Sequence, residues 1–268
     1  MSDAVFTPTP YAEVNAILQQ LLPQVQAILG PQFLAMYLYG SLALGDFTLT
    51  RSDIDFVVVT AGDLPPDLIA ALYTMHADIA AQEIPWGGEL EGSYIPQHTL
   101  RRPDPNAPRY PTIERGETLR LNPRTTGGLI QRTILREHGI TLAGPPPTHW
   151  IDPVAPDDLR QEALAIAQEW LAPLAANPVS LRSTGYQSYT VLTICRMLYT
   201  LEHGTIVSKP TAARWAQTAL GPRWAPLIAY ALADELEETR ALIGYALDRL
   251  HTTALPVTAT DPRPPDPV

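Results

Sequence analysis

Hydrophobic positions in the first hundred residues switch between helical and strand spacing. Apolar side chains recur in steps of three and four over residues 11–29 and 65–82, which predicts two helices. Residues 34–40 and 54–60 are short apolar runs, and residues 89–96 alternate between apolar and polar, so each of the three predicts a strand. Helices that interleave with strands in this way are typical of an α/β unit built on a small sheet.

The pattern changes after a proline-rich segment, residues 101–124. Proline fixes φ and has no amide hydrogen, so we expect neither helix interiors nor central strands in this segment. Beyond it, the spacing of apolar residues predicts helices only, which suits a helical bundle. The expected helices span residues 128–138, 157–176, 185–203, 209–220 and 224–251.

These patterns together predict an α+β protein with two domains. We expect an N-terminal α/β domain with a small mixed sheet over residues 1–125. An all-α helical bundle is expected over residues 126–254, followed by a proline-rich, disordered tail over residues 255–268.

Composition and charge narrow the classes of function. A hydrophobic content of 46% supports a packed core, and a net charge of −10 argues against a broad nucleic-acid-binding face. The single cysteine, Cys195, excludes an intramolecular disulfide or a cysteine-cluster zinc site. No apolar run reaches the roughly 18–20 residues of a membrane span, and the first residues do not resemble a signal peptide. We therefore expect a cytoplasmic protein with no nucleic-acid or membrane partner, and the acidic balance suits a cationic one.

Two aspartates, Asp53 and Asp55, stand at the start of the second predicted strand. Side chains two apart on a strand point to one face, so these carboxylates repel each other beside an apolar strand. A divalent cation relieves that repulsion, and Mg²⁺ typically takes one or two carboxylates together with substrate phosphates. The pair indicates a Mg²⁺ site, although two solvated loop aspartates are the simpler interpretation of an isolated Asp-x-Asp.

Gly40 and Ser41 follow the first predicted strand, about a dozen residues before the aspartates. A glycine there permits a positive φ and the close approach of a ligand, and Ser41 offers an N–H and a hydroxyl to a phosphate oxygen. A phosphate cradle next to a metal pair favours phosphoryl-transfer chemistry. Glu89 and Glu91, on one face of the third predicted strand, are the candidates for a third carboxylate.

The combination of Tyr39-Gly40-Ser41 with Ser52-Asp53-Ile54-Asp55 resembles the motif of the nucleotidyltransferase superfamily whose prototype is DNA polymerase β. Within that superfamily, most of the chain is similar to the bacterial aminoglycoside (3″)(9) adenylyltransferases, which modify streptomycin and spectinomycin. The rest of the resemblance is carried by residues 140–145, 152–154, 191–199 and 204–206, together with Lys209.

The resemblance implies Mg²⁺, ATP as co-substrate, transfer of AMP to a sugar hydroxyl and release of pyrophosphate. It implies that Asp53 and Asp55 hold the metal, and that Ser41, Ser52, Arg196 and Lys209 hold the triphosphate. Two cations on a helix and the following loop would neutralise a phosphate chain, although both are also ordinary formers of surface ion pairs.

The resemblance also implies a strand glutamate as the general base. We favour Glu91, because a position deeper in the strand is desolvated and has a raised pKa. Glu89 follows two glycines and is expected at the exposed entry to the strand, and it remains the alternative.

The acceptor does not follow from the resemblance. The family carries a drug-binding acidic residue ahead of the helix at 191–199, whereas this chain has Tyr186-Gln187 and no carboxylate over residues 185–189. A cationic, hydroxylated small molecule is the expected acceptor. The alternatives are transfer to a protein side-chain hydroxyl or another small acceptor, and a nucleotide-binding module without turnover.

Overall fold

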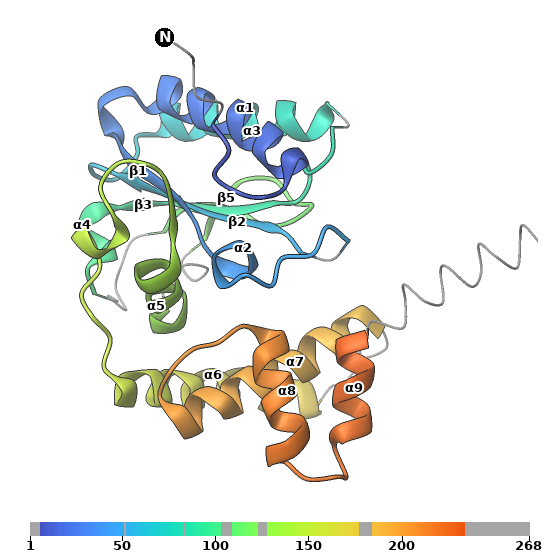
Figure 1. Ribbon diagram of the computed structural model, residues 1–268. Helices are drawn as coiled ribbons and strands as arrows, with labels where there is room; N and C mark the ends of the chain where they lie inside the picture. Colours follow the sequence, from blue (N-terminus) through green and yellow to red (C-terminus); the bar gives the residue numbers. More distant parts are fainter. Residues whose placement is uncertain are drawn as a thin grey trace, which may run out of the picture.

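The computed structural model describes residues 6–50, 52–82, 84–102, 109–122, 128–176 and 184–233. A mixed sheet forms the middle of the molecule in Figure 1, with helices on both faces and a group of further helices beyond one face. This arrangement confirms the predicted fold class, a sheet domain followed by a helical part.

The sheet has six strands in the order β5-β4-β3-β2-β1-β6. Strands β2 and β3 are parallel, and every other neighbouring pair is antiparallel. The strands are β1 (Phe33–Leu38), β2 (Ile54–Thr60), β3 (Leu90–Pro96), β4 (Tyr110–Ile113), β5 (Arg120–Asn122) and β6 (Ile140–Ala143).

Alternation along β2 assigns the two faces of the sheet. Ile54, Phe56 and Val58 pack into a core beneath α1 (Ala12–Leu29) and α3 (Pro66–Ala81). Val57 and Val59 pack into a second core on the opposite face. Because side chains alternate along a strand, the side chain of Asp55 lies on the same face as the second core.

The second face carries shorter helices and then the helical part. The shorter elements are α2 (Gly40–Leu44), α4 (Gln97–Leu100), α5 (Leu129–His138) and η2 (Pro147–His149). A further short turn of helix, η1 (Gly30–Gln32), joins α1 to β1. The helical part consists of α6 (Pro156–Ala176), α7 (Thr184–His203), α8 (Lys209–Ala219) and α9 (Ala225–Ala233). The part of the 224–251 prediction beyond residue 233, and the tail over 255–268, lie outside the described residues.

The expectation that the proline-rich segment contains no central strand was wrong. Strands β4 and β5 both lie in it, and β4 runs between β3 and β5 with Pro111 inside it. The register between β3 and β4 covers only Thr112 and Ile113, so Pro111 lies beyond that pairing and needs no amide donor toward β3.

The expectation of helices only beyond that segment was also wrong, because β6 pairs with β1 at the edge of the sheet. Helix α5 packs against α2 and the second core. We therefore propose that the boundary between the two parts lies after β6 rather than at residue 125. In the part of the chain that the structure describes, no helix is both long and apolar enough to cross a membrane.

Candidate functional site

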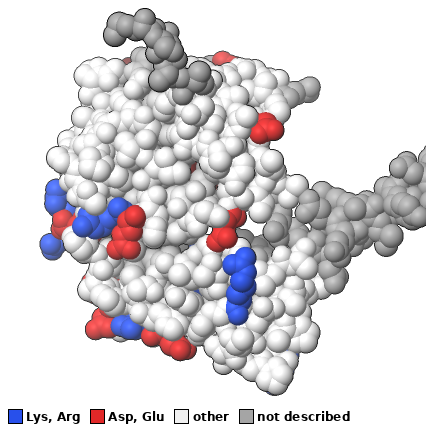
Figure 2. Space-filling view, in the orientation of Figure 1, with Lys and Arg blue, Asp and Glu red and all other residues white. Residues whose placement is uncertain are grey.

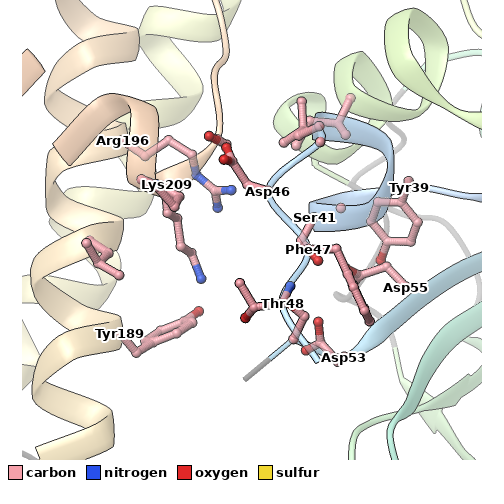
Figure 3. A pocket seen from close by; sticks show the side chains of 18 of the residues that line it. Tyr39, Ser41, Asp46, Phe47, Thr48, Asp53, Asp55, Tyr189, Arg196 and Lys209 are labelled. Atoms are coloured by element: carbon pink, nitrogen blue, oxygen red, sulfur yellow. The ribbon is translucent and has the colours of Figure 1, made fainter. Parts of the chain in front are cut away.

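A cavity of about 1300 Å³ lies between the sheet and the helical part. Figure 3 shows Ser41, Asp53 and Asp55 on one wall, and it shows Tyr189, Arg196 and Lys209 on the opposite wall. Acidic and basic side chains also lie on either side of the junction between the two parts in the space-filling view of Figure 2. The cavity therefore has an acidic wall from the sheet and a cationic wall from helices α7 and α8.

The parallel pairing of β2 with β3 brings three predicted carboxylates to this cavity. Asp55 is the direct register partner of Glu91, and Asp53 lies two residues before Asp55. All three line the cavity. Residues so far apart in sequence converge because β2 and β3 begin at the same edge of the sheet.

This crowding shifts the proton affinities of the carboxylates. Burial raises the pKa of Asp55 well above its usual range, and the charges of Asp53 and Glu91 raise it further. Burial raises the pKa of Glu91 to about 7, with Asp53 and Glu114 adding to the effect. Glu91 therefore titrates near neutral pH, which suits a group that exchanges a proton with substrate.

The donor set fits a divalent cation bound together with a phosphate ligand. Among the described residues, no three His, Cys, Asp or Glu side chains form a ready metal cage. Asp53 and Asp55 supply two carboxylates, which is the number that Mg²⁺ commonly takes when substrate phosphates and water complete its shell. A positive ion between them would also relieve the charge repulsion that raises the pKa of Asp55.

Gly40 occupies the turn between β1 and α2 in a conformation with a φ of 60°. The backbone there lies against β2, since Tyr39 N–H donates to the carbonyl oxygen of Asp55 at 3.0 Å. A Cβ on Gly40 would stand 1.8 Å from Oδ2 of Asp55. The predicted positive φ is present, and the group that approaches this glycine most closely is the carboxylate of Asp55.

Gly40→Ala should therefore damage the site more than the fold. The substitution must displace the Asp55 carboxylate, and we expect transfer to fall by at least about 10-fold, consistent with misplacement of a group near the chemistry. A steady-state assay and thermal unfolding should be run side by side. Gly45→Ala is the matched control, because Gly45 has a φ of 75° at the other end of α2 with nothing within 4 Å of its added Cβ. An equal loss of activity in both variants would contradict the steric argument.

Ser41 has the property expected of a phosphate ligand. Its hydroxyl oxygen is buried and has no hydrogen-bond partner among the described residues. Buried polar atoms are rarely left in that state, so the position suits a polar group of a bound substrate. Ser52 differs, because its hydroxyl accepts a hydrogen bond from Thr48 N–H at 3.0 Å.

The cationic wall comes from two helices. Arg196 lies in α7, and Lys209 is the first residue of α8, whose start is fixed by a hydrogen bond from Thr211 N–H to the Ser208 hydroxyl at 3.3 Å. Burial and the nearby Arg196 lower the pKa of Lys209 to about 8, and the carboxylates across the cavity partly offset this. Both cations therefore face a space in which an anion would be stabilised.

The two glutamates near the start of β3 have different surroundings. Glu91 lies within β3, whereas Glu89 precedes the strand and forms an ion pair with the side chain of Arg115. The backbone N–H of Arg115 in turn donates a hydrogen bond to Glu91. Sequence reasoning missed Arg115, because the proline-rich segment that carries it showed no strand pattern.

Sequence reasoning also missed Tyr189, which lines the cavity. Its ring centroid lies 4.0 Å from the ammonium nitrogen of Lys209. An aromatic ring, and not a carboxylate, is what the stretch 185–189 contributes to the cavity wall. The helical spacing of Tyr186, Tyr189 and Arg196 along α7 was the available signal, since residues three or four apart share a helix face.

Three carboxylates at the start of a parallel strand pair, a Gly-Ser turn and two facing cations form an arrangement that suits nucleotidyl transfer. Residues 18–92 match the family model of the nucleotidyltransferase domain. Residues 150–257 match the model described as "Aminoglycoside adenylyltransferase, C-terminal domain".

Curated relatives and a solved structure agree with these matches. An aminoglycoside (3″)(9) adenylyltransferase of Escherichia coli is 29% identical over 91% of this chain and 90% of that protein. One from Rhizobium radiobacter is 27% identical over 76% of this chain and 74% of that protein. A spectinomycin adenyltransferase from Enterococcus faecialis, solved with ATP and spectinomycin, shares the fold with a TM-score of 0.62 and 16% identity, over 84% of this chain and 89% of that one.

The chain is a nucleotidyltransferase that resembles the aminoglycoside (3″)(9) adenylyltransferases over nearly its whole length. The resemblance and the enzyme class predicted from the motifs are both confirmed.

Proposed function

We propose that this protein transfers AMP from ATP to a hydroxyl group of an aminoglycoside of the streptomycin and spectinomycin type and releases pyrophosphate. The observation that carries the proposal is the cavity in which Asp53, Asp55 and Glu91 face Arg196 and Lys209. The names of the curated relatives support the nucleotide and the class of acceptor. Because ATP is a cytoplasmic metabolite, we place the reaction in the cytoplasm.

The nucleotide lies across the cavity in this proposal. The Gly40-Ser41 turn and Ser52 contact its phosphates from the sheet side, and Arg196 and Lys209 neutralise them from the helical side. Asp53 and Asp55 would hold Mg²⁺, which would supply charge neutralisation to the phosphates. The acidic wall thereby tolerates a polyanionic substrate.

Glu91 acts as the general base. Its carboxylate takes the proton of the acceptor hydroxyl, whose oxygen then bonds to the α-phosphorus while the bond to the pyrophosphate oxygen breaks. The raised pKa of Glu91, about 7, makes it a stronger proton acceptor than an ordinary glutamate and leaves a usable fraction ionised at neutral pH.

The acceptor is the cationic, hydroxylated molecule that the acidic wall attracts. One observation favours a range beyond streptomycin and spectinomycin, namely that Gly185, Ser188 and Tyr189 line the cavity without a carboxylate. We therefore keep a different small hydroxylated acceptor as the second candidate.

The test is incubation of the protein with ATP labelled at the α-phosphate, Mg²⁺ and a panel of aminoglycosides and other amino alcohols. We expect label to move to the acceptor, with a gain in mass of one AMP group and release of pyrophosphate. Label on an acceptor without hydroxyl groups, or ATP hydrolysis without transfer to any acceptor, would contradict the proposal. Asp53→Asn serves as the inactive control.

A further inference from the structure

Lys209 contacts an aromatic ring at the cavity wall. Its ammonium nitrogen lies 4.0 Å from the centroid of the Tyr189 ring, well within the range of a cation–π interaction. The two residues come from different helices, α7 and α8. In Figure 3 both side chains project into the cavity toward the wall that carries Asp53.

The Tyr189 ring is held in place by two further aromatic residues. Tyr186, one helical turn earlier in α7, stacks on it with centroids 6.0 Å apart, and Trp170 of α6 meets it edge-on at 6.1 Å. The indole N–H of Trp170 donates to the Tyr186 hydroxyl at 3.3 Å. Although 48% of Tyr189 is exposed, its ring is therefore restrained by two neighbouring aromatic side chains.

The charges around Lys209 explain why such a ring matters. Arg196 repels the ammonium group, whereas Asp53, Asp55 and Glu91 attract it across the cavity. In the described part of the chain, no carboxylate forms an ion pair with Lys209. In the described part of the chain, the Tyr189 ring is thus the group that contacts the ammonium.

We propose that Tyr189 is a positioning residue, which holds the Lys209 ammonium over its ring at the place where a nucleotide phosphate binds. The inference rests on the proposed function only in assigning a phosphate to Lys209. The attraction comes from the π-electrons of the ring and not from the hydroxyl, so phenylalanine should replace Tyr189 and an aliphatic residue should not.

The experiment is calorimetric titration of the full chain with ATP and Mg²⁺, using Tyr189→Leu, Tyr189→Phe, Lys209→Met and the double variant Tyr189→Leu/Lys209→Met. We expect Tyr189→Leu to weaken ATP binding about 3- to 10-fold and Tyr189→Phe to stay within about 2-fold, as fits a partly exposed cation–π pair. In the Lys209→Met background, Tyr189→Leu should have no further effect. In steady-state assays, the loss should fall on KM for ATP more than on kcat.

A matched control tests for general damage. Tyr73 on α3 has an exposed fraction of 46%, close to that of Tyr189, and lies on the opposite face of the sheet. Tyr73→Leu should bind ATP as the parent protein does, and circular dichroism should show that all variants are folded. Weaker binding in Tyr73→Leu, of the same size as in Tyr189→Leu, would overturn the inference.

The other outcomes separate this inference from the proposed function. If Lys209→Met weakens binding and Tyr189→Leu does not, the positioning role is wrong and the phosphate role of Lys209 stands. If Tyr189→Leu weakens binding equally with and without Lys209, the ring contacts the nucleotide itself and positioning is overturned. If Lys209→Met changes nothing, the assignment of Lys209 in the proposed function fails first.

Discussion

Replacing Glu91 with glutamine should lower the transfer rate at saturating substrates by about 10²–10⁴-fold, the usual contribution of a positioned general base. Glutamine keeps the size of the side chain and its hydrogen-bonding atoms on β3, so ATP affinity should change little. Steady-state kinetics with ATP and acceptor both saturating measure this rate, and nucleotide titration measures the affinity. Loss of ATP binding would place Glu91 among the nucleotide ligands instead.

The structure provides the control for this experiment. Glu89 precedes β3 and forms an ion pair with Arg115, and unlike Asp53, Asp55 and Glu91 it does not line the cavity. We expect Glu89→Gln to retain most of the rate, with a small loss because Arg115 also donates its backbone N–H to Glu91. If Glu89→Gln is the inactive variant and Glu91→Gln is nearly normal, the base assignment is off by two residues.

The pH dependence of the reaction gives an independent readout. A base must be deprotonated to act, and the pKa of Glu91 is raised from 4.5 to about 7. Transfer should therefore fall progressively as the pH drops through about 7, well above the range where an unperturbed glutamate titrates. The small residual rate of Glu91→Gln should lack this limb of the profile.

The longer helices and strands could be predicted from sequence, because the spacing of apolar residues along each one shows which of its faces is buried. The β-branched run of β2 (Ile54–Thr60) and the amphipathic spacing of α1 agree with the structure to within one residue at each end. Strands β4, β5 and β6 carried no such signal. They are three or four residues long, and they are held mainly by pairing with neighbouring strands, which a local pattern does not reveal.

The candidate site likewise has one part that local sequence spacing predicts and another that depends on long-range contacts. The sequence indicated Asp53 and Asp55 because Asp55 lies on β2 and Asp53 stands directly before it, with the two-residue spacing that directs both side chains to one face. The register that places Glu91 beside Asp55 depends on long-range pairing, and so does the contact of Arg115 with both glutamates. The pair formed by Tyr189 and Lys209 depends on how α7 packs against α8, and no spacing along the chain reports that contact.

Asp53→Asn and Asp55→Asn should each abolish detectable transfer while leaving the protein folded. Asparagine has the size of aspartate but carries no charge, and a neutral amide is a poor ligand for Mg²⁺ beside phosphates. The measurement is transfer of labelled AMP over a Mg²⁺ titration, together with ATP binding at each concentration. Activity restored to the parent level at saturating Mg²⁺ in either variant would contradict the metal assignment.

We also expect Asp55→Asn to change the thermal stability of the protein. The folded-state pKa of Asp55 lies above its unfolded value, because burial and the charges of Asp53 and Glu91 oppose ionisation. Its ionised form is therefore a cost to the folded state at neutral and higher pH, and this cost disappears as the pH falls through the unfolded value. Asp55→Asn should raise the thermal midpoint at pH 8 and lose that advantage at pH 4. Asp78→Asn, an exposed site on α3, should shift neither midpoint. A lower midpoint for Asp55→Asn at pH 8 would show that the Asp55 carboxylate stabilises the fold. The argument that its charge is repelled by Asp53 and Glu91 would then be wrong.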